Sequence, residues 1–301
     1  MKVPPFLKKR DKVAIVAPAG NIPGGVLDAV GLLQSWGLEV VLGESVNSFH
    51  HQFAGDDHLR AGDFQRMLDD PDIKAIIAAR GGYGTVRIID RIDFSGFAEN
   101  PKWVIGFSDI TVLHSHIQAL FAIPTLHAQM PLNIPDATKP SLESLRQALF
   151  GETLSYQYQS NQGNRNGTAD GVLTGGNLAI LVSIAGSVSE PDYTGKILFI
   201  EDVGEYYYSI DRMMRMLKRS GRLKDLAGLI VGGFTALKDN EVRFGQTAEE
   251  IIFDVVKEYA YPVATGFPAG HIENNHALIF GKKVSLQVSD ETVALTYYPS
   301  I

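Results

Sequence analysis

The chain has 301 residues, of which 45% are hydrophobic, so it can bury one large core or two ordinary ones. Its formal net charge of −7 argues against a nucleic-acid partner, because proteins that bind phosphate backbones usually present a basic face. The sequence contains no cysteine, which excludes disulfides, thiolate catalysis, zinc–thiolate sites and iron–sulfur ligation and fits a reducing compartment.

The hydrophobic pattern indicates neither export nor a membrane. The first ten residues are basic and are broken by Pro4 and Pro5, with no apolar stretch behind them, unlike a signal peptide. No run approaches the ~20 apolar residues of a membrane span. These features predict a soluble, cytoplasmic globular protein without a membrane partner.

The first half of the chain alternates apolar strands with helices. The expected strands are 12–17, 38–42, 73–79 and 103–105, and the expected helices are 26–36, 59–68, a segment from Thr85, and 110–120. Strands that are apolar on both faces and alternate with helices predict a parallel sheet with helices on either side. Ligands bind to such sheets beyond the carboxyl ends of the strands.

The stretch 156–170 is polar and rich in turn residues, which fits either a domain boundary or a long hairpin loop inside one domain. On the first interpretation, we expect an N-terminal α/β domain over 1–152, a linker over 153–167 and a smaller C-terminal α/β domain over 168–301.

The second half is expected to mix helices with strands. The expected elements are helices over 177–185 and 248–259, an amphipathic helix through Met213 and Met214, strands over 196–200 and 227–232, and short strands from Ala277 to Tyr298. The methionines share one stripe of their helix, which favours a place in the core over contact with a cofactor.

Ser108 stands at a corner where the strand 103–105 gives way, after Gly106, to a helix. Such a corner lifts the hydroxyl out of the sheet beside backbone N–H groups, which is the geometry that acyl transfer needs. Helix capping is the alternative role for this serine. The hydrolase signature Gly-x-Ser-x-Gly is incomplete, because Ile110 stands where the last glycine belongs.

The loop Gly81-Gly82-Tyr83-Gly84 also follows a strand and precedes a helix, so its amides could cradle an anion. It lacks the third glycine of a dinucleotide fingerprint, and the chain contains no Gly-x-x-x-x-Gly-Lys-Ser/Thr phosphate loop. Relief of a tight turn is one alternative. Another is that an N–H of this loop supplies an oxyanion donor beside Asp109.

A base and an orienting acid are available in the second half. His271 follows the turn-rich segment 266–270 and is expected on a loop at the rim of the fold. Glu201 and Glu205 follow a buried strand, where they form a turn or orient an imidazole. The chain order Ser, Glu, His occurs among serine triads, but spacing does not choose between the two glutamates.

No metal site is expected from the histidines. His114 and His116 lie two residues apart on a predicted helix and therefore point to different faces, and there is no His-Glu-x-x-His pattern.

Taken together, these fragments resemble the LD-carboxypeptidases, also called muramoyl-tetrapeptide carboxypeptidases, which are serine peptidases of bacterial cell-wall recycling. The blocks that carry the resemblance are Val16-Ala17-Pro18-Ala19-Gly20, Arg80-Gly81-Gly82-Tyr83-Gly84, Gly106-Phe107-Ser108-Asp109, Gly175-Gly176-Asn177-Leu178, Leu198-Phe199-Ile200-Glu201-Asp202, Ile210-Asp211-Arg212-Met213 and Gly270-His271. Their order is more specific than any single block. The chain departs from the family pattern at Phe107, where tyrosine or histidine is common, and at Tyr206-Tyr207-Tyr208, which replaces a proline-containing stretch.

The resemblance implies Ser108 as the nucleophile, Glu201 and His271 as its partners, and an oxyanion hole from the backbone N–H groups of Gly82 and Asp109. It also implies an N-terminal α/β domain with a smaller C-terminal one, no metal or other cofactor, and a homodimer. The implied reaction removes terminal D-alanine from an L-centre diamino acid in murein tetrapeptides.

A carboxypeptidase must also hold the terminal carboxylate of its substrate, and Arg80 and Arg212 are the candidates for that role. A sister group in the family cleaves the peptide–nucleotide microcin C, but its members tend to be longer, with extra pocket loops. A member with another amide or acyl substrate is also compatible with the triad. A non-catalytic nucleotide- or sugar-binding module that uses the loop 81–84 is the alternative from another class.

Overall fold

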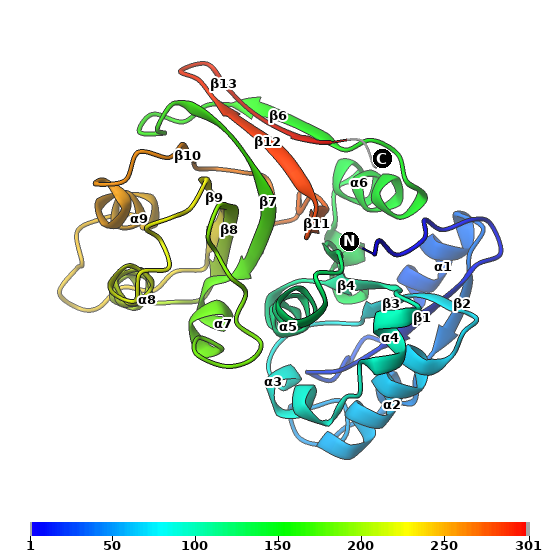
Figure 1. The fold of residues 1–301 in the computed structure, drawn as a ribbon. Helices are drawn as coiled ribbons and strands as arrows, with labels where there is room; N and C mark the ends of the chain where they lie inside the picture. The colour runs from blue at the N-terminus through cyan, green and yellow to red at the C-terminus, as the bar shows by residue number, and fades with distance from the viewer. Residues whose placement is uncertain (1, 299–301) are drawn as a thin grey trace.

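Two β-sheets, each with helices packed on it, make up the computed structural model, which describes residues 2–298 (Figure 1). The first sheet has six strands in the order β11-β5-β4-β3-β1-β2. Its strands are β1 (Lys12–Val16), β2 (Glu39–Leu42), β3 (Ile73–Ala78), β4 (Trp103–Gly106), β5 (Thr125–His127) and β11 (Leu278–Phe280). All neighbouring pairs are parallel except β11 with β5.

Helices cover both faces of this sheet. They are α1 (Leu27–Ser35), α2 (Asp57–Asp69), α3 (Thr85–Ile88), α4 (Ser95–Glu99), α5 (Thr111–Phe121) and α6 (Lys139–Phe150), with short helices η1 (Glu44–Asn47), η2 (Ile89–Arg91), η3 (Ser108–Ile110) and η4 (Pro131–Asp136). Ile76 and Ile77 of β3 point to opposite faces and belong to two different hydrophobic clusters. Burial on both faces explains the uninterrupted apolar runs, and the predicted parallel α/β sheet is confirmed.

The second sheet has seven strands in the order β10-β9-β8-β7-β12-β13-β6. Its strands are β6 (Ser155–Gln159), β7 (Gly167–Asn177), β8 (Lys196–Val203), β9 (Gly228–Thr235), β10 (Val263–Ala264), β12 (Lys283–Val288) and β13 (Thr292–Tyr297). The run from β7 to β10 is parallel, whereas β12, β13 and β6 pair antiparallel.

The helices of the second half are α7 (Leu178–Ser183), α8 (Tyr207–Arg219) and α9 (Ala248–Val256). Met213 and Met214 are buried in the cluster that α8 and α9 form with β8 and β9, as the amphipathic pattern predicts. No helix within residues 2–298 combines the length and apolar character needed to cross a bilayer.

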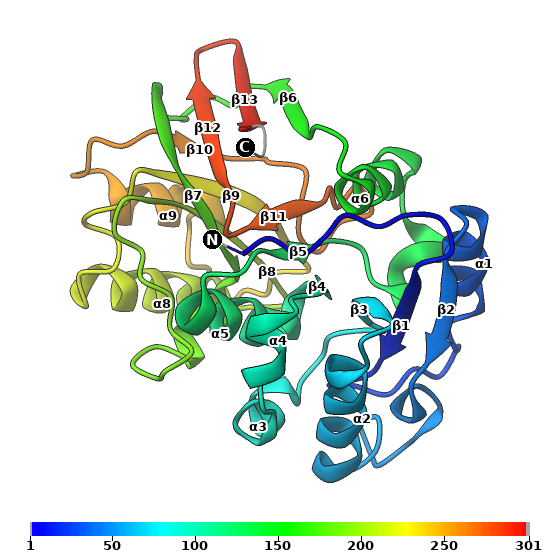
Figure 2. The ribbon, with the colours of Figure 1, turned by 45° about the vertical axis from the view of Figure 1, so that its right-hand side comes forward.

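Two features differ from the expected division of the chain. The expected linker 153–167 contains the edge strand β6, in which Tyr156 and Tyr158 alternate with polar residues. Such alternation is typical of a half-buried strand, but the polar, turn-rich run that follows it led to the prediction of a linker. Strand β11 lies in the second half of the sequence but extends the first sheet beside β5 (Figure 2). The residue ranges of the two domains therefore stay a prediction.

Helix α5 lies between the two sheets, in contact with β4 and β5 on one side and with α7 and β7 on the other (Figure 1). A hydrogen bond from the N–H of Asn177 to Oγ1 of Thr111, 3.0 Å long, joins the end of β7 to the start of α5. Since α5 follows Ser108 directly, this contact ties the second sheet to the serine corner.

Candidate active site

Ser108 lies where β4 ends and η3 begins, with α5 following at once. Its φ of 63° is in the left-handed region, which costs a residue with a side chain ~1–2 kcal/mol. The N-cap of α5 is Ile110, and it makes no side-chain cap, so Ser108 does not cap this helix. The strand-to-helix corner with a partly exposed serine is the arrangement that the sequence predicted, whereas the backbone strain is visible only in the structure.

The glycine loop packs directly against this corner, because β3 and β4 are neighbours in the sheet. A Cβ placed on Gly81 would lie 2.9 Å from Cβ of Ser108, so only glycine allows the approach. It would also lie 3.3 Å from the backbone nitrogen of Asp109. Within residues 2–298, the N–H groups of Gly82 and Asp109 donate no backbone hydrogen bond, and their role as an oxyanion hole stays a prediction.

Two buried side chains, Asp109 and Arg60, hold the loop and the corner together. Oδ2 of Asp109 accepts the N–H of Thr85 at 2.8 Å, and burial raises the pKa of this carboxyl. Nη1 of Arg60 donates to the carbonyls of Gly84, at 3.0 Å, and of Pro18. Sequence reasoning missed Arg60, since an arginine in an amphipathic helix carries no sign that it is buried.

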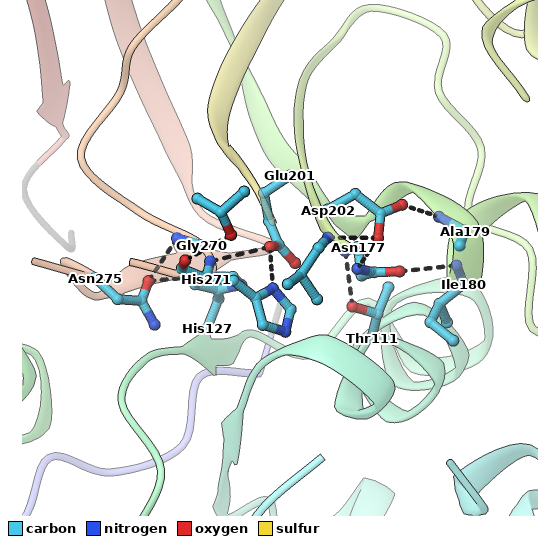
Figure 3. A network of polar contacts seen from close by, with 12 residues as sticks. Thr111, His127, Asn177, Ala179, Ile180, Glu201, Asp202, Gly270, His271 and Asn275 are labelled. Atoms are coloured by element: carbon cyan, nitrogen blue, oxygen red, sulfur yellow. Dashed lines mark hydrogen bonds and ion pairs between the residues drawn. The ribbon is translucent and has the colours of Figure 1, made fainter. Parts of the chain in front are cut away.

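Glu201 and His271 form a close pair (Figure 3). Glu201 is fully buried on β8, and its Oε2 lies 2.5 Å from Nδ1 of His271. Burial lowers the pKa of His271, but the hydrogen bond and charge of Glu201 outweigh it, so the net pKa is raised. No contact joins Glu205 to His271 in the described chain, so the geometry selects Glu201 from the two glutamates.

The imidazole of His271 also contacts the corner that carries Ser108. The ring of Phe107, the residue before Ser108, packs edge-to-face on His271 with the ring centroids 4.9 Å apart. In residues 2–298, no hydrogen bond joins Ser108 to His271. Such hydrogen bonds are often long in unliganded sites and shorten when substrate binds.

Asp202, next to Glu201, belongs to a second polar network that the sequence did not reveal (Figure 3). Its carboxylate accepts Nδ2 of Asn177 at 2.8 Å and the N–H of Ala179 at 2.9 Å. Burial, reinforced by the charge of Glu201, raises the pKa of Asp202 to about 6. Through Asn177 and its bond to Thr111, this network connects β8 with α5.

The two arginines have different surroundings. Arg80 directly precedes the glycine loop, and its Nη1 donates to the carbonyl of Asn21 at 2.9 Å. Arg212 is exposed on α8, with its guanidinium 5.4 Å from the centroid of the Tyr208 ring and Nη2 3.4 Å from Oγ of Ser209. Arg80 therefore lies next to the loop that packs on Ser108, whereas no contact joins Arg212 to that loop in residues 2–298.

The arrangement combines a hydroxyl on a strained corner, an imidazole oriented by a buried carboxylate, and backbone N–H groups that donate to no backbone carbonyl in residues 2–298. These are the groups that nucleophilic acyl transfer requires. Among residues 2–298, no three His, Asp or Glu side chains are grouped so that they could hold a metal ion.

The sequence matches known proteins over nearly its full length. Residues 13–128 match the LD-carboxypeptidase N-terminal domain, and residues 170–286 match the LD-carboxypeptidase C-terminal domain. The chain is 35% identical to a probable murein peptide carboxypeptidase of Bacillus subtilis, over 97% of this chain and 93% of the relative. It is 32% identical to a murein tetrapeptide carboxypeptidase of Pseudomonas aeruginosa, over 92% of this chain and 93% of the relative.

Structural comparison agrees. The crystal structure of muramoyltetrapeptide carboxypeptidase from Oxalobacter formigenes superposes with a TM-score of 0.87 at 29% identity, over 96% of this chain and 100% of that chain. The microcin C7 self-immunity protein of Escherichia coli is 27% identical over 89% of this chain and 86% of the relative. With relatives at 32% and 35% identity over almost all of its length, the chain belongs to the LD-carboxypeptidase family.

Proposed function

We propose that the protein is a serine LD-carboxypeptidase of peptidoglycan recycling. It hydrolyses the bond between an L-centre diamino acid, diaminopimelate or lysine, and the terminal D-alanine of murein tetrapeptides. The observation that carries the proposal is the contact between the Glu201–His271 pair and the corner at Ser108. The relatives named for murein peptides support the substrate class.

In this mechanism Oγ of Ser108 attacks the carbonyl carbon of the third residue while His271 takes the hydroxyl proton. The N–H groups of Gly82 and Asp109 bind the oxyanion, and losing one such donor typically costs ~10²–10³ in rate. The tetrahedral intermediate collapses, His271 gives its proton to the leaving amine, and D-alanine departs. Water then hydrolyses the acyl-enzyme by the same steps.

Glu201 acts through the imidazole. Its Oε2 accepts from Nδ1 of His271, which leaves Nε2 unprotonated and able to receive the serine proton. Once His271 is protonated, the buried carboxylate stabilises the imidazolium. Arg80 is the better placed of the two arginines to bind the substrate's carboxylate, because it directly precedes the glycine loop, and Arg212 stays a prediction.

Localisation and assembly belong to the same proposal. We expect the protein to act in the cytoplasm as a homodimer. Cell fractionation and sedimentation equilibrium test these two expectations independently of the activity.

One second function has a specific observation in its favour. The 27% identity to a microcin C7 self-immunity protein makes a peptide–nucleotide amide the first alternative substrate.

A non-catalytic binding module would instead retain its ligand affinity in Ser108→Ala and hydrolyse nothing.

The experiment that tests the substrate assignment is a release assay with purified protein. Release of alanine of either configuration is measured from a UDP-free murein tetrapeptide, from the same peptide ending in L-alanine, and from a pentapeptide ending in D-alanyl-D-alanine. Release from the tetrapeptide alone supports the proposal. Release only from the pentapeptide, or hydrolysis only of an aminoacyl nucleotide amide, overturns it.

A further inference from the structure

Asn275 connects the loop that carries His271 to the first sheet. Its side chain is fully buried, and Oδ1 accepts two hydrogen bonds, from the N–H of Gly270 at 2.8 Å and from Nε2 of His127 at 3.1 Å. Figure 3 shows these contacts beside the Glu201–His271 pair. Because Gly270 directly precedes His271, one of the two bonds holds the peptide next to the imidazole.

The direction of both bonds is fixed by the backbone. The N–H of Gly270 can only donate, so the amide atom that it meets is the oxygen of Asn275. That oxygen can only accept from His127, whose proton must therefore be on Nε2. Complete burial lowers the pKa of His127 to about 3, so the ring is neutral at neutral pH. His127 is a hydrogen-bond donor here and not a general base.

His127 also touches the serine corner. It ends β5, where it pairs with Gly106 at the end of β4. The centroid of its ring lies 5.6 Å from the centroid of the Phe107 ring. The Phe107 centroid lies 4.9 Å from that of His271. His127 thus contacts the corner that carries Ser108 and, through Asn275, the loop that carries His271.

We propose that Asn275 and His127 are positioning residues that hold Gly270, and with it His271, in register with the corner at Ser108. The inference rests on the proposed function, in which His271 takes the proton of Ser108. Neither side chain touches the reacting atoms, and the effect passes through the backbone of Gly270.

The peptide at Gly270 has little room to move. A Cβ on Gly270 would lie 2.7 Å from Cβ of Glu201, and the φ of 108° suits glycine alone. The carbonyl of His271 is held on the far side by Oγ1 of Thr235 at 3.0 Å. Loss of the Asn275 bond therefore displaces the imidazole relative to both Glu201 and Ser108.

The test is the rate of D-alanine release by His127→Phe, which keeps an aromatic ring and removes the donor. We expect kcat to fall ~10–100-fold while KM stays within about twofold, because misalignment affects the reacting atoms and not substrate binding. His127→Gln keeps an N–H donor and is expected to recover most of the lost kcat. Asn275→Leu combined with His127→Phe is expected to be no worse than Asn275→Leu alone.

His116→Phe is the matched control. It makes the same exchange at another buried histidine, breaks a hydrogen bond of 2.8 Å to Ser189 and touches neither the corner nor the loop, so kcat should not change. If wild-type protein releases D-alanine but His127→Phe keeps its kcat, or His127→Gln is as slow as His127→Phe, the positioning role is wrong while the proposed function stands. If the wild type releases no D-alanine, the proposed function itself fails.

A second measurement does not depend on the substrate. NMR of isotope-labelled histidine should show His127 as the neutral Nε2–H tautomer throughout the pH range in which the fold is stable. An Nδ1–H tautomer, or protonation near the ordinary histidine pKa, would contradict the hydrogen bond to Asn275 on which the inference depends.

Discussion

Oε2 of Glu201 contacts His271 twice, lying 2.5 Å from the ring Nδ1 and accepting the backbone N–H of the same residue at 3.2 Å. Two bonds from one buried oxygen fix both the rotation of the ring and the place of its peptide. The carboxylate therefore orients the imidazole as well as stabilising its charged form.

Glu201→Gln is expected to shift the pH dependence of catalysis. Burial lowers the pKa of His271 and Glu201 raises it, with a net value above the ordinary 6.5. The base must be neutral, so kcat/KM falls as pH drops through this raised pKa. Removing the charge of Glu201 leaves burial, which lowers the pKa of His271, opposed by the smaller effect of the Asp202 charge. The acid limb should therefore move to lower pH while the maximal kcat falls by ~10²–10⁴.

The measurement is the pH profile of kcat/KM for D-alanine release. Glu205→Gln is the control and should leave the limb unchanged, because no contact links Glu205 to His271 in the described chain. An acid limb that stays in place in Glu201→Gln would show that His271 is not the titrating base.

Ser108→Gly should be more stable than Ser108→Ala although both are inactive. Ser108 has a φ of 63°, which costs ~1–2 kcal/mol for any residue with a Cβ, while glycine gains freedom in the unfolded chain worth ~0.5–1 kcal/mol. The free energy of unfolding of Ser108→Gly should therefore exceed that of Ser108→Ala by ~1 kcal/mol, which calorimetry would show as a Tm about 2 °C higher. Ala122→Gly, at the left-handed C-cap of α5 with a φ of 50°, should gain stability without losing activity. Equal free energies of unfolding for the two Ser108 variants would show that the backbone at Ser108 is not strained.

Gly81→Ala is expected to inactivate the enzyme without unfolding it. The new methyl group would lie 2.9 Å from Cβ and 3.0 Å from Oγ of Ser108, so the serine must move. Displacing a nucleophile from its reactive position costs ~10²-fold in rate. Gly62→Ala, on an exposed position of α2 with open space around it, is the control and should leave kcat unchanged. Full activity in Gly81→Ala would show that the loop does not constrain the nucleophile.

Arg80→Gln should raise KM more than Arg212→Gln does. Arg80 directly precedes the glycine loop that packs on Ser108, where a cation can bind the carboxylate of terminal D-alanine. Arg212 is exposed on α8 beside Tyr208. Steady-state kinetics on the tetrapeptide and on its C-terminal amide separates the two roles, since only the residue that binds the carboxylate discriminates between these peptides. A larger effect at Arg212 would reverse the assignment.

Strands β1, β3 and β4 of the first sheet could be predicted because burial on both faces gives them continuous apolar runs, as in Ile76 and Ile77. The short strand β5 was not predicted. The corner at Ser108 and the glycine loop could be found because each interrupts such a run locally. Strand β6 was missed although Tyr156 and Tyr158 alternate with polar residues, because the turn-rich run directly after it favoured a linker. The pairing of β11 with β5 depends on a contact between distant parts of the chain that no local pattern encodes.

The residues that support the site could not be identified from the sequence for the same reason. His127 and Asn275 are 148 positions apart, and neither belongs to a motif. Asp202 could be seen only as the neighbour of Glu201, because its partners Asn177 and Ala179 lie on another element. Buried polar residues acquire their roles from the tertiary fold, so sequence patterns reveal the reacting groups before the groups that hold them.

The most direct test of the account is D-alanine release from murein tetrapeptide by Ser108→Ala, measured beside the wild type. Circular dichroism and thermal unfolding first establish that the variant keeps the fold. We predict that kcat falls more than ~10³-fold, because the remaining groups can bind substrate and polarise its carbonyl but cannot form an acyl-enzyme. Release at a rate near that of the wild type would show that Ser108 is not the nucleophile and would contradict the mechanism.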